Sequence, residues 1–460
     1  MPLILPANTL STDAYAVANS CHFEAGDSAA MNITIGSDGD KTEWTFSAWI
    51  KLVASTATVV IFNGYVSGDN ETRIFISSRK LQYYNYVSSA ADGEYATSRL
   101  LRDPSAWYHI VVAIDNDEGT AGDRIRFYIN GVEETYFGTE TAPSSGSVTF
   151  VNDDNAHYLG RSGSGQYFDG YMAEVCFIDG QQLAASSFGE FDSDSPTMWK
   201  AKDVSGLTFG SNGFYLDFED SDNLGDDESG NGNDLAEVNI AATDQKIDTP
   251  TNNFCVLNTN WSTKGGTPGA GTFSKGNLKF VGDGDHDCTF GTIGLQNGLW
   301  YWEVLLSNDA GAGIQIGATT TEAMQDITSG DSGTCYPTFV GFRNEVETIN
   351  WNVVSVSDYG ANATNDIYGL LLDLDSGTKT LKCYHNDTLK DTINLPTDKG
   401  DTWIPYIGDT GSADAEMEAN FGNPPYAISS GNADPSGYGD FEFATKSGYA
   451  ICTKNLAEQG

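Results

Sequence analysis

The sequence predicts an all-β protein built from two antiparallel β-sandwich domains of jelly-roll type, joined by an acidic connector. Three observations lead to this fold class. Short β-rich runs recur between clusters of Gly, Asn, Asp and Ser. Several of these runs alternate apolar and polar residues with a period of two, as half-buried strands do. A chain of 460 residues also fits two sandwiches of about 200–250 residues each.

The first half of the chain carries regularly spaced strand signals, which is typical of a sandwich. The clearest alternation is Trp44, Phe46, Ala48. Asn130-Gly131 predicts a two-residue hairpin turn. One short helix is expected over residues 181–188. The expected strands are Thr45–Val53, Thr58–Phe62, Thr72–Ser77, Trp107–Ile114, Ile125–Ile129, Ser147–Val151 and Tyr171–Ile178.

The middle of the chain differs in composition. Residues 201–260 carry a net charge of −10 and are rich in Asn, Gly and Asp, so we expect a connector, ordered in part by Phe214–Phe218. The expected organisation is an extended segment 1–14, a sandwich 15–205, a connector 206–254, a sandwich 255–425 and a tail 426–460. Strands are expected in the second sandwich at Asn277–Phe280, Leu299–Leu306, Gly313–Gly317, Ile367–Asp373, Thr380–His385, Trp403–Ile407 and Glu416–Phe421.

The charge balance excludes several classes of partner. The net charge of the chain is −41, which repels phosphate backbones and anionic lipids, so we expect no nucleic-acid binding and no peripheral membrane binding. No run approaches the ~18 apolar residues that a membrane helix needs, so we expect no membrane insertion. The start MPLILPANTL lacks a basic region, and its apolar stretch is too short for a signal peptide. Seven scattered cysteines without CxxC spacing are expected to be small core residues. We therefore expect synthesis in a reducing cytoplasm.

The first domain resembles laminin-G-like, concanavalin-A-like lectin domains. The motifs WTFSAWIK (44–51), WYHIVVAID (107–115), RIRFYINGVE (124–133) and YLGRSGSGQYFDGYMAEVCFIDG (158–180) follow one another in that family's order. In the last motif Asp169-Gly170 turns the chain. We expect Tyr171, Ala173 and Val175 to lie on one face of the following strand. The resemblance implies a sandwich over about residues 15–200.

The second domain resembles SPRY domains, which are bent β-sandwiches. LWYWEVLL (299–306), the IGA strand near 314–317, YGLLLDLDSGTKTLKCYHNDT (368–388) and WIPYIGDTGSADAEMEANFG (403–422) occur in that family's order. Because SPRY domains bind partners through loops at one end, the loop surface around Arg343, Trp351 and Tyr359 is a candidate binding site.

Three further segments resemble structural proteins of marine bacteriophages, of cyanophage and pelagiphage type. They are residues 211–234, 243–258 and the tail SGYAICTKNL (447–456). This resemblance implies a virion protein that is assembled in the host cytoplasm, contacts other virion proteins and forms a homo-oligomer, with a trimer favoured.

Calcium is the expected metal, because hard cations prefer clustered oxygen ligands in irregular loops. The preferred loop holds Asp226, Asp227, Asn231, Asn233 and Asp234, which resembles the DxSGNGN stretch of many lectin-like domains. A second loop holds Asp115, Asp117 and Asp123. Further candidates are Asp153, Asp154 and Asn155, and the trio Asp283, Asp285 and Asp287. Chance clustering in so acidic a chain is the alternative.

Sugar binding requires exposed aromatic planes beside hydrogen-bonding groups. Tyr84, Tyr86 and Asn85 provide this combination. On a strand Tyr84 and Tyr86 share one face while Tyr83 points to the other. Since one face must be core, at least one of these tyrosines is structural.

Catalytic motifs are lacking in the sequence. The nearest carboxylate pattern, Asp217, Glu219, Asp220 and Asp222, falls in the polar connector, where acids are normally solvated. His109 falls within an expected strand and is interpreted as a hydrogen-bonded histidine of the core or edge. We therefore expect no enzyme. The preferred hypothesis is a tail-fibre or surface-appendage adhesin for a host-surface glycan or protein. The alternatives are a capsid or tail decoration or scaffold protein and, least favoured, a glycan-cleaving enzyme.

Overall fold

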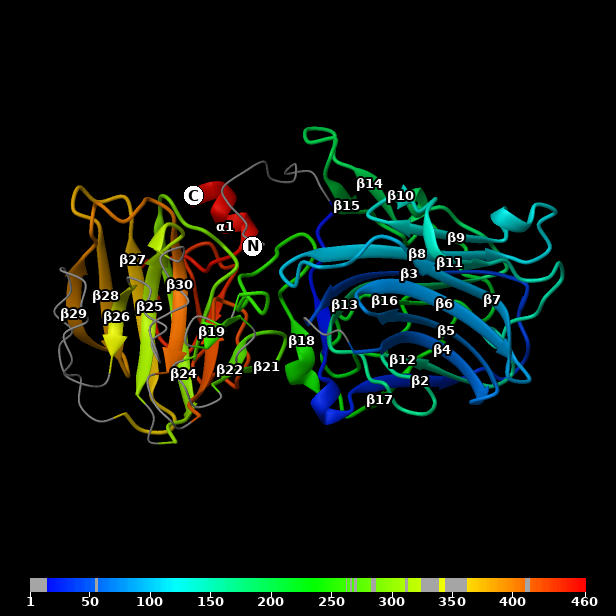
Figure 1. Ribbon diagram of the computed structural model, residues 1–460, viewed down its shortest axis with the longest axis horizontal. Coiled ribbons are helices and arrows are strands. Elements are labelled where there is room, and N and C mark those ends of the chain that lie inside the picture. The colour runs from blue at the N-terminus through cyan, green and yellow to red at the C-terminus, as the bar shows by residue number, and fades with distance from the viewer. Residues whose placement is uncertain are drawn as a thin grey trace. The chain divides into compact units, whose positions relative to one another are not determined.

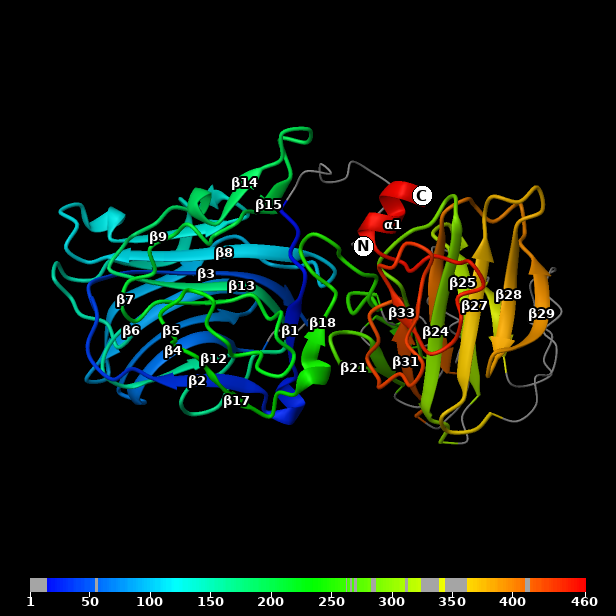
Figure 2. The ribbon, with the colours of Figure 1, turned by 180° about the vertical axis from the view of Figure 1, so that it is seen from behind.

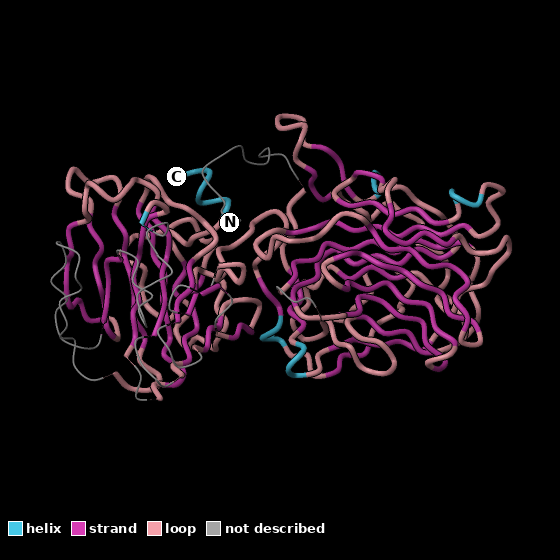
Figure 3. Tube along the Cα trace, viewed as in Figure 1, coloured by secondary structure: helices cyan, strands magenta, loops and turns pink. Residues whose placement is uncertain are grey.

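The chain forms two compact units, Leu10–Thr251 and a second one that includes Asn252–Gly460. The computed structural model describes residues 15–53, 57–261, 263–264, 267–268, 271–282, 287–310, 313–323, 339–343, 362–409 and 414–460. Strands dominate both units and the helices are few and short (Figures 1 and 3). The all-β antiparallel fold class expected from the sequence is confirmed. The extended segment expected over 1–14 lies outside the described residues.

Two eight-stranded antiparallel sheets make up the first unit. One sheet consists of β10 (Val132–Glu133), β9 (Ile125–Ile129), β8 (Trp107–Asp115), β3 (Glu43–Leu52), β13 (Gly170–Asp179), β1 (Ser20–Phe23) and β18 (Gln245–Lys246), with β16 (Phe214–Leu216) also paired to β13. The other consists of β11 (Phe137–Thr141), β7 (Ala90–Thr97), β6 (Lys80–Val87), β5 (Asn70–Ser77), β4 (Val59–Ser67), β12 (Ala156–Leu159), β2 (Ala30–Thr34) and β17 (Ala236–Val238). A separate hairpin pairs β14 (Gly189–Phe191) with β15 (Trp199–Ala201). The 3-10 helices are η1 (Ala25–Asp27), η2 (Ala121–Asp123), η3 (Ala185–Ser187) and η4 (Ala242–Asp244).

The core of this unit lies between its two sheets. Trp44 and Phe46 of the first sheet and Phe62 and Ile74 of the second belong to one buried cluster. Phe46 and Phe62 stack across the sandwich with ring centroids 5.0 Å apart. The unit is therefore a two-layer sandwich with one main core.

A β-bulge in β13 changes which side chains face that core. The pairing of β13 with β3 shifts register between Ala173 and Cys176, and Glu174 has φ 51°. Tyr171 and Ala173 therefore pack in an outer cluster, whereas Val175 belongs to the main core. The expectation that all three share one face is wrong, because the extra residue of a bulge reverses the alternation beyond it.

The segment expected to be a connector lies within the first unit. β16 pairs with β13, β17 with β2, and β18 with β1. Figure 2 shows β17 beside β2 and β18 beside β1. Its apolar side chains belong to the main core: Leu216, Phe218, Leu224, Leu235 and Ile240. Residues 214–246 thus complete both sheets, and the acidic residues occupy the intervening turns.

Two other local expectations also differ from the structure. Residues 147–151 form a loop instead of a strand, because side chains satisfy its backbone: Asn116 and Asn85 donate to the carbonyl oxygens of Ser147 and Val148. The helix expected over 181–188 is only the single 3-10 turn η3, held by i to i−3 hydrogen bonds. The Asn130-Gly131 hairpin is confirmed, since it joins β9 to β10 with φ 49° and 75°.

The second unit contains two further antiparallel sheets. One consists of β20 (Thr267–Pro268), β19 (Thr263–Lys264), β23 (Asp287–Phe290), β30 (Trp403–Asp409), β25 (Ile314–Thr320) and β26 (Phe339–Arg343). The other consists of β21 (Thr272–Ser274), β22 (Lys279–Val281), β31 (Glu416–Asn420), β24 (Leu299–Asn308), β27 (Ile367–Asp373), β28 (Thr380–His385) and β29 (Thr388–Asn394). A hairpin of β32 (Asn432–Ala433) and β33 (Asp440–Phe441) and the helix α1 (Thr453–Gln459) follow.

The C-terminal segment expected as a tail is part of this unit. Ile451 and Leu456 belong to its core, together with Trp302 and Ile316. The buried Glu303 carboxylate accepts hydrogen bonds from the backbone N–H groups of Glu442 and Phe443, at 3.0 and 2.8 Å. Residues 440–456 therefore close the second sandwich.

The cysteines are mostly core residues. Five of them are buried thiols: Cys21, Cys176, Cys255, Cys383 and Cys452. Cys288 differs from the expectation, since it is disulfide-bonded. Among the described residues, no helix has the length and apolar character that crossing a membrane requires.

Candidate functional site

Aromatic and arginine side chains gather on the outward surface of the sheet that contains β4, β5, β6 and β12. We call this surface the aromatic face and define it by Tyr65, Arg73, Phe75, Tyr84, Tyr86, Tyr158 and Arg161. Strand alternation places them there: Tyr83 belongs to the core, so Tyr84 and Tyr86 point outward. The sequence had predicted this division of the three tyrosines between the two faces.

Tyr84 is the centre of one half of the aromatic face. Its hydroxyl donates a 2.6 Å hydrogen bond to Glu71 Oε1. The Arg73 guanidinium lies 4.2 Å from the centroid of its ring, and the Tyr86 ring lies edge-on at 4.4 Å. Burial, followed by the hydrogen bond to Glu71, raises the pKa of Tyr84. Tyr84 is only 9% exposed, so Tyr86 and Arg73 present more of this half to solvent.

The other half of the aromatic face is formed by Tyr65, Tyr158 and Arg161. The rings of Tyr65 and Tyr158 meet edge to face at 6.4 Å, and Arg161 lies 4.6 Å above the Tyr158 ring. A side chain at Gly163 would collide with the Tyr65 ring, since its Cβ would lie 2.2 Å from ring carbons. Gln166, three residues after Gly163, contacts the half that contains Tyr84, because its Oε1 accepts a hydrogen bond from Arg73 at 2.5 Å.

This arrangement suits recognition of polar ligands that have apolar patches. Tyrosine rings stack on apolar C–H surfaces, and guanidinium groups donate several hydrogen bonds in fixed geometry. The arginines also place positive charge on one surface of a strongly acidic chain. Tyr65, Arg73, Tyr158 and Arg161 were missed from the sequence, because they adjoin Tyr84 and Tyr86 only through strand register.

Asn85, expected beside these tyrosines, is on the opposite side of β6 and is fully buried. Its Oδ1 accepts a 2.6 Å hydrogen bond from Thr72 Oγ1, and its Nδ2 donates to Val148 O. It therefore supports the loop over 147–151 and is not available to a ligand on the aromatic face. In the second unit, Trp351 and Tyr359 lie outside the described residues. Arg343 ends β26, and its side chain is likewise outside the description.

The loop preferred for calcium is held together by its own hydrogen bonds. The Asp227 carboxylate accepts from the backbone N–H groups of Tyr215, Ser229 and Asn233. Asn231 and Asn233 both donate to Gly213 O, at 2.9 Å. Among the described residues, the carboxylates of Asp226, Asp227 and Asp234 do not converge as a set of three donors. These hydrogen bonds hold the loop in shape, and calcium there stays a prediction.

The second calcium candidate is also dispersed. Asp115 Oδ1 accepts from the backbone N–H of Asp117, and Asp123 pairs with Arg126 at 3.1 Å. Asp153 and Asp154 do approach each other, together with Asp38. Asp283 and Asp285 lie outside the described residues, and Asp287 is buried in β23.

The carboxylates considered for catalysis form local turns. Asp217 Oδ1 accepts from the backbone N–H of Glu219, and Asp220 Oδ1 accepts from that of Asp222. His109 is buried and hydrogen-bonded as expected: Ser47 Oγ lies 2.9 Å from its Nε2, and Trp199 Nε1 lies 3.1 Å from its Nδ1. Burial lowers the pKa of His109 to about 3, which keeps the ring neutral at ordinary pH.

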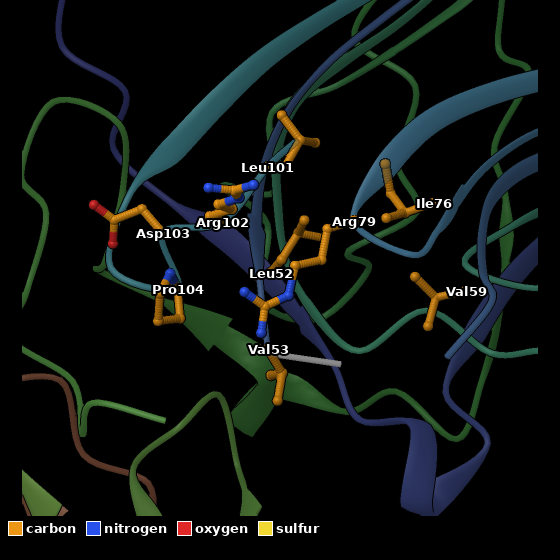
Figure 4. A pocket seen from close by; sticks show the side chains of 9 residues that line it. All are labelled: Leu52, Val53, Val59, Ile76, Arg79, Leu101, Arg102, Asp103 and Pro104. Atoms are coloured by element: carbon orange, nitrogen blue, oxygen red, sulfur yellow. The ribbon is translucent and has the colours of Figure 1, made fainter. Parts of the chain in front are cut away.

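A small pocket opens at the ends of β3 and β4 (Figure 4). Its walls are mostly aliphatic, with Arg79, Arg102 and Asp103 at the polar side. The cavity measures about 20 Å³, which is room for about one water molecule. It is far below the ~300 Å³ or more of a pocket that encloses a small-molecule ligand. The aromatic face is therefore the stronger candidate.

Comparison with known proteins agrees with this architecture. A family model described as the concanavalin A-like lectin/glucanases superfamily (Laminin_G_3) matches residues 25–185. Residues 25–185 of the first unit are therefore similar to concanavalin A-like, laminin G-like domains. The match ends before residues 214–246, which the structure adds to both sheets of this unit.

Three of the solved structures that match this chain are the following. The match to a heptameric pentraxin from Limulus polyphemus covers 37% of this chain and 80% of the pentraxin chain, with 13% identity and a TM-score of 0.26. The match to domains LG4-5 of the mouse laminin α1 chain covers 90% of this chain and 91% of the laminin chain, with 11% identity and a TM-score of 0.30. The match to domain 4 of an arabinanase from Geobacillus stearothermophilus, in complex with arabinotriose, covers 34% of this chain and 66% of the arabinanase chain. The identity is 19% and the TM-score is 0.24. The search of curated proteins found no match.

Proposed function

We propose that this chain is a non-catalytic adhesin whose aromatic face binds a host-surface glycan. The observation that carries the proposal is the placement of Arg73 against Tyr84, with Tyr86 beside it, on the outward surface of the first unit. Such a surface offers ring faces to the apolar side of a sugar and N–H donors to its hydroxyl groups. A glycan spreads along an open surface of this kind, so a deep pocket is not needed.

The biological setting of the proposal is a bacteriophage tail fibre or other surface appendage. The resemblance of residues 211–234, 243–258 and 447–456 to virion proteins of marine phages supports it. The proposal includes a homo-oligomer, with a trimer favoured, because many weak glycan contacts become stable attachment when copies are linked. In this setting the SPRY-like second unit serves to dock on other virion proteins.

Binding of the purified full-length chain to a glycan array and to host cells tests the proposal. We expect binding by the natural chain, and binding at least about fivefold weaker for Tyr86→Ala and Arg73→Met, as loss of one stacking or guanidinium contact implies. Phe191→Ala is the matched control, because Phe191 is an exposed aromatic residue in β14, outside the aromatic face. Its binding should equal that of the natural chain.

Repeating the assay with a chelator tests the calcium prediction separately. Loss of binding in chelator, restored by calcium alone, would support a calcium site in one of the predicted loops. A chain that binds neither glycans nor host cells under either condition would instead favour the decoration or scaffold alternative. Equal binding by Tyr86→Ala and the natural chain would remove the aromatic face from the proposal.

A further inference from the structure

A histidine and two carboxylates converge at the edge where β1 meets the start of β13. One donor atom from each of His22, Glu24 and Asp169 lies within 4.8 Å of the other two. His22 Nε2 is 3.9 Å from Glu24 Oε2. These residues are far from the aromatic face in strand order, since β1 and β13 belong to the other sheet. We propose that they form a binding site for a divalent transition-metal ion of the zinc type.

Backbone hydrogen bonds hold the donors in place before any ion binds. The register pairs His22 with Tyr171 and Phe23 with Gly170, which brings Asp169 beside Glu24. Glu24 O accepts from the N–H groups of Asp27 and Ala29, both at 3.2 Å. Such anchoring of the ligand-bearing residues is what a specific metal site requires.

The turn that carries Asp169 is equally constrained. Asp169 O accepts from Val53 N at 3.1 Å. Gly170 has φ 142°, and a Cβ there would lie 2.1 Å from Lys51 O. Only glycine fits this approach, so the chain reverses at one fixed point. The position of the Asp169 carboxylate next to β1 follows from that geometry.

The electrostatics of the site favour a cation. Asp169 Oδ1 is buried and has no hydrogen-bond partner among the described residues. A divalent ion would neutralise both carboxylates and give the buried oxygen a ligand.

The donor types select the class of ion. An imidazole nitrogen with two carboxylate oxygens suits zinc and its neighbours, whereas calcium prefers six to eight oxygen donors. His22 is only 5% exposed, so its ring is held within the protein and does not sweep through solvent. Three protein ligands leave a further coordination position for water or for a donor from a partner.

A second acidic cluster provides the contrast. Asp38, Asp153 and Asp154 also approach within 4.8 Å. There Lys41 Nζ already lies 2.8 Å from Asp38 and 2.9 Å from Asp153. Lys41 thus already supplies positive charge to that cluster, and the cluster contains no imidazole. It therefore serves as the control site.

The test uses the full chain, stripped with a chelator, reloaded with zinc chloride and desalted. We expect about one zinc ion per chain by elemental analysis, and a thermal midpoint of the first unit that rises with zinc. His22→Gln and Asp169→Asn should lower zinc affinity at least about tenfold and abolish the shift of the midpoint. Asp154→Asn, in the control cluster, should behave like the natural chain.

Glu24→Gln keeps the test decisive if the two buried variants fail to fold, because the Glu24 side chain is partly exposed (17%). It should bind zinc at least about tenfold more weakly while it retains the unfolding midpoint of the metal-free natural chain. The inference would be overturned by a natural chain that takes up no zinc, by one that takes up only calcium, or by folded variants with unchanged zinc affinity.

Discussion

Lys51 and Asp248 form an ion pair that solvent barely reaches. Lys51 Nζ lies 2.6 Å from Asp248 Oδ2, and the side chains are 1% and 0% exposed. Asp248 Oδ1 also accepts a 3.0 Å hydrogen bond from Trp107 Nε1. This pair ties the segment after β18 to β3 and β8, so the end of the supposed connector is bonded to the centre of the first unit.

Removing one partner of this pair should destabilise the first unit strongly. A buried charge without its counter-ion typically costs about 3–5 kcal/mol. We therefore expect Lys51→Met and Asp248→Asn each to lower the free energy of unfolding of the first unit by roughly that amount. The double variant should lose less than the sum of the two. Calorimetry or urea unfolding of the full chain measures these values.

Lys41→Met is the control for this prediction. Lys41 also pairs with aspartates, but its side chain is 26% exposed, and surface pairs contribute about 1 kcal/mol or less. An equal loss for the two lysine variants would contradict the assignment of Lys51 to a buried pair.

Glu174 should make the stability of the first unit depend on pH. Burial raises the pKa of Glu174 to about 7 in the folded chain, from an ordinary value of 4.5. The folded state therefore binds the proton more tightly than the unfolded state. This stabilising contribution is fully present below pH of about 4.5 and is lost as pH rises through about 7. Unfolding free energies measured from pH 4.5 to 8 should show this decline.

Glu174→Gln isolates the contribution of this carboxyl group. The amide keeps the polar shape that accepts the hydrogen bond from Tyr215 Oη, which is 2.9 Å in the natural chain, but it does not titrate. The decline in stability over this pH range should be smaller in the variant than in the natural chain. Parallel pH profiles for the two chains would show that Glu174 titrates normally.

Leu216→Ala tests whether the acidic segment belongs to the first unit. Leu216 is fully buried in the main core, and a Leu→Ala change in a core typically costs about 2–5 kcal/mol. Val66→Ala, at a site 54% exposed, should change stability by less than about 0.5 kcal/mol. Similar small effects of both changes on the unfolding free energy of the first unit would mean that the segment does not support the sandwich.

Much of the strand pattern could be predicted from the sequence, because alternation reports burial directly. The expected strands Ile125–Ile129, Ile367–Asp373 and Thr380–His385 match β9, β27 and β28 to the residue. The segment 147–151 has the same composition as a strand. It is a loop because Asn85 and Asn116 satisfy its carbonyl groups, and such long-range side-chain partners leave no local signal.

The acidic segment was hard to place for a related reason. Its carboxylates lie in turns, and the core residues between them, such as Leu224 and Leu235, occur singly without strand periodicity. Average composition therefore indicates a connector, although a few apolar side chains suffice to anchor the chain. The bulge at Glu174 was also hard to predict. Its single inserted residue turns the Val175 side chain to the other face of the strand, and the sequence pattern gives no sign of it.

The candidate site was only partly accessible from the sequence. Alternation along β6 places Tyr84 and Tyr86 on one face and Tyr83 on the other. This division can be predicted from the sequence of β6 alone. Arg73 and Tyr158 reach the same surface through pairings across β5, β4 and β12. His22 and Asp169 likewise meet only because β1 pairs with β13.

The pairing of β1 with β18 affects how the chain reaches this fold during synthesis. Ser20 donates a hydrogen bond to Asp248 O, a residue 228 positions later. β1 therefore cannot pair with β18 until most of the first unit has left the ribosome. Closing so long a loop slows folding, so the edge of the nascent first sheet stays open to other chains for much of translation.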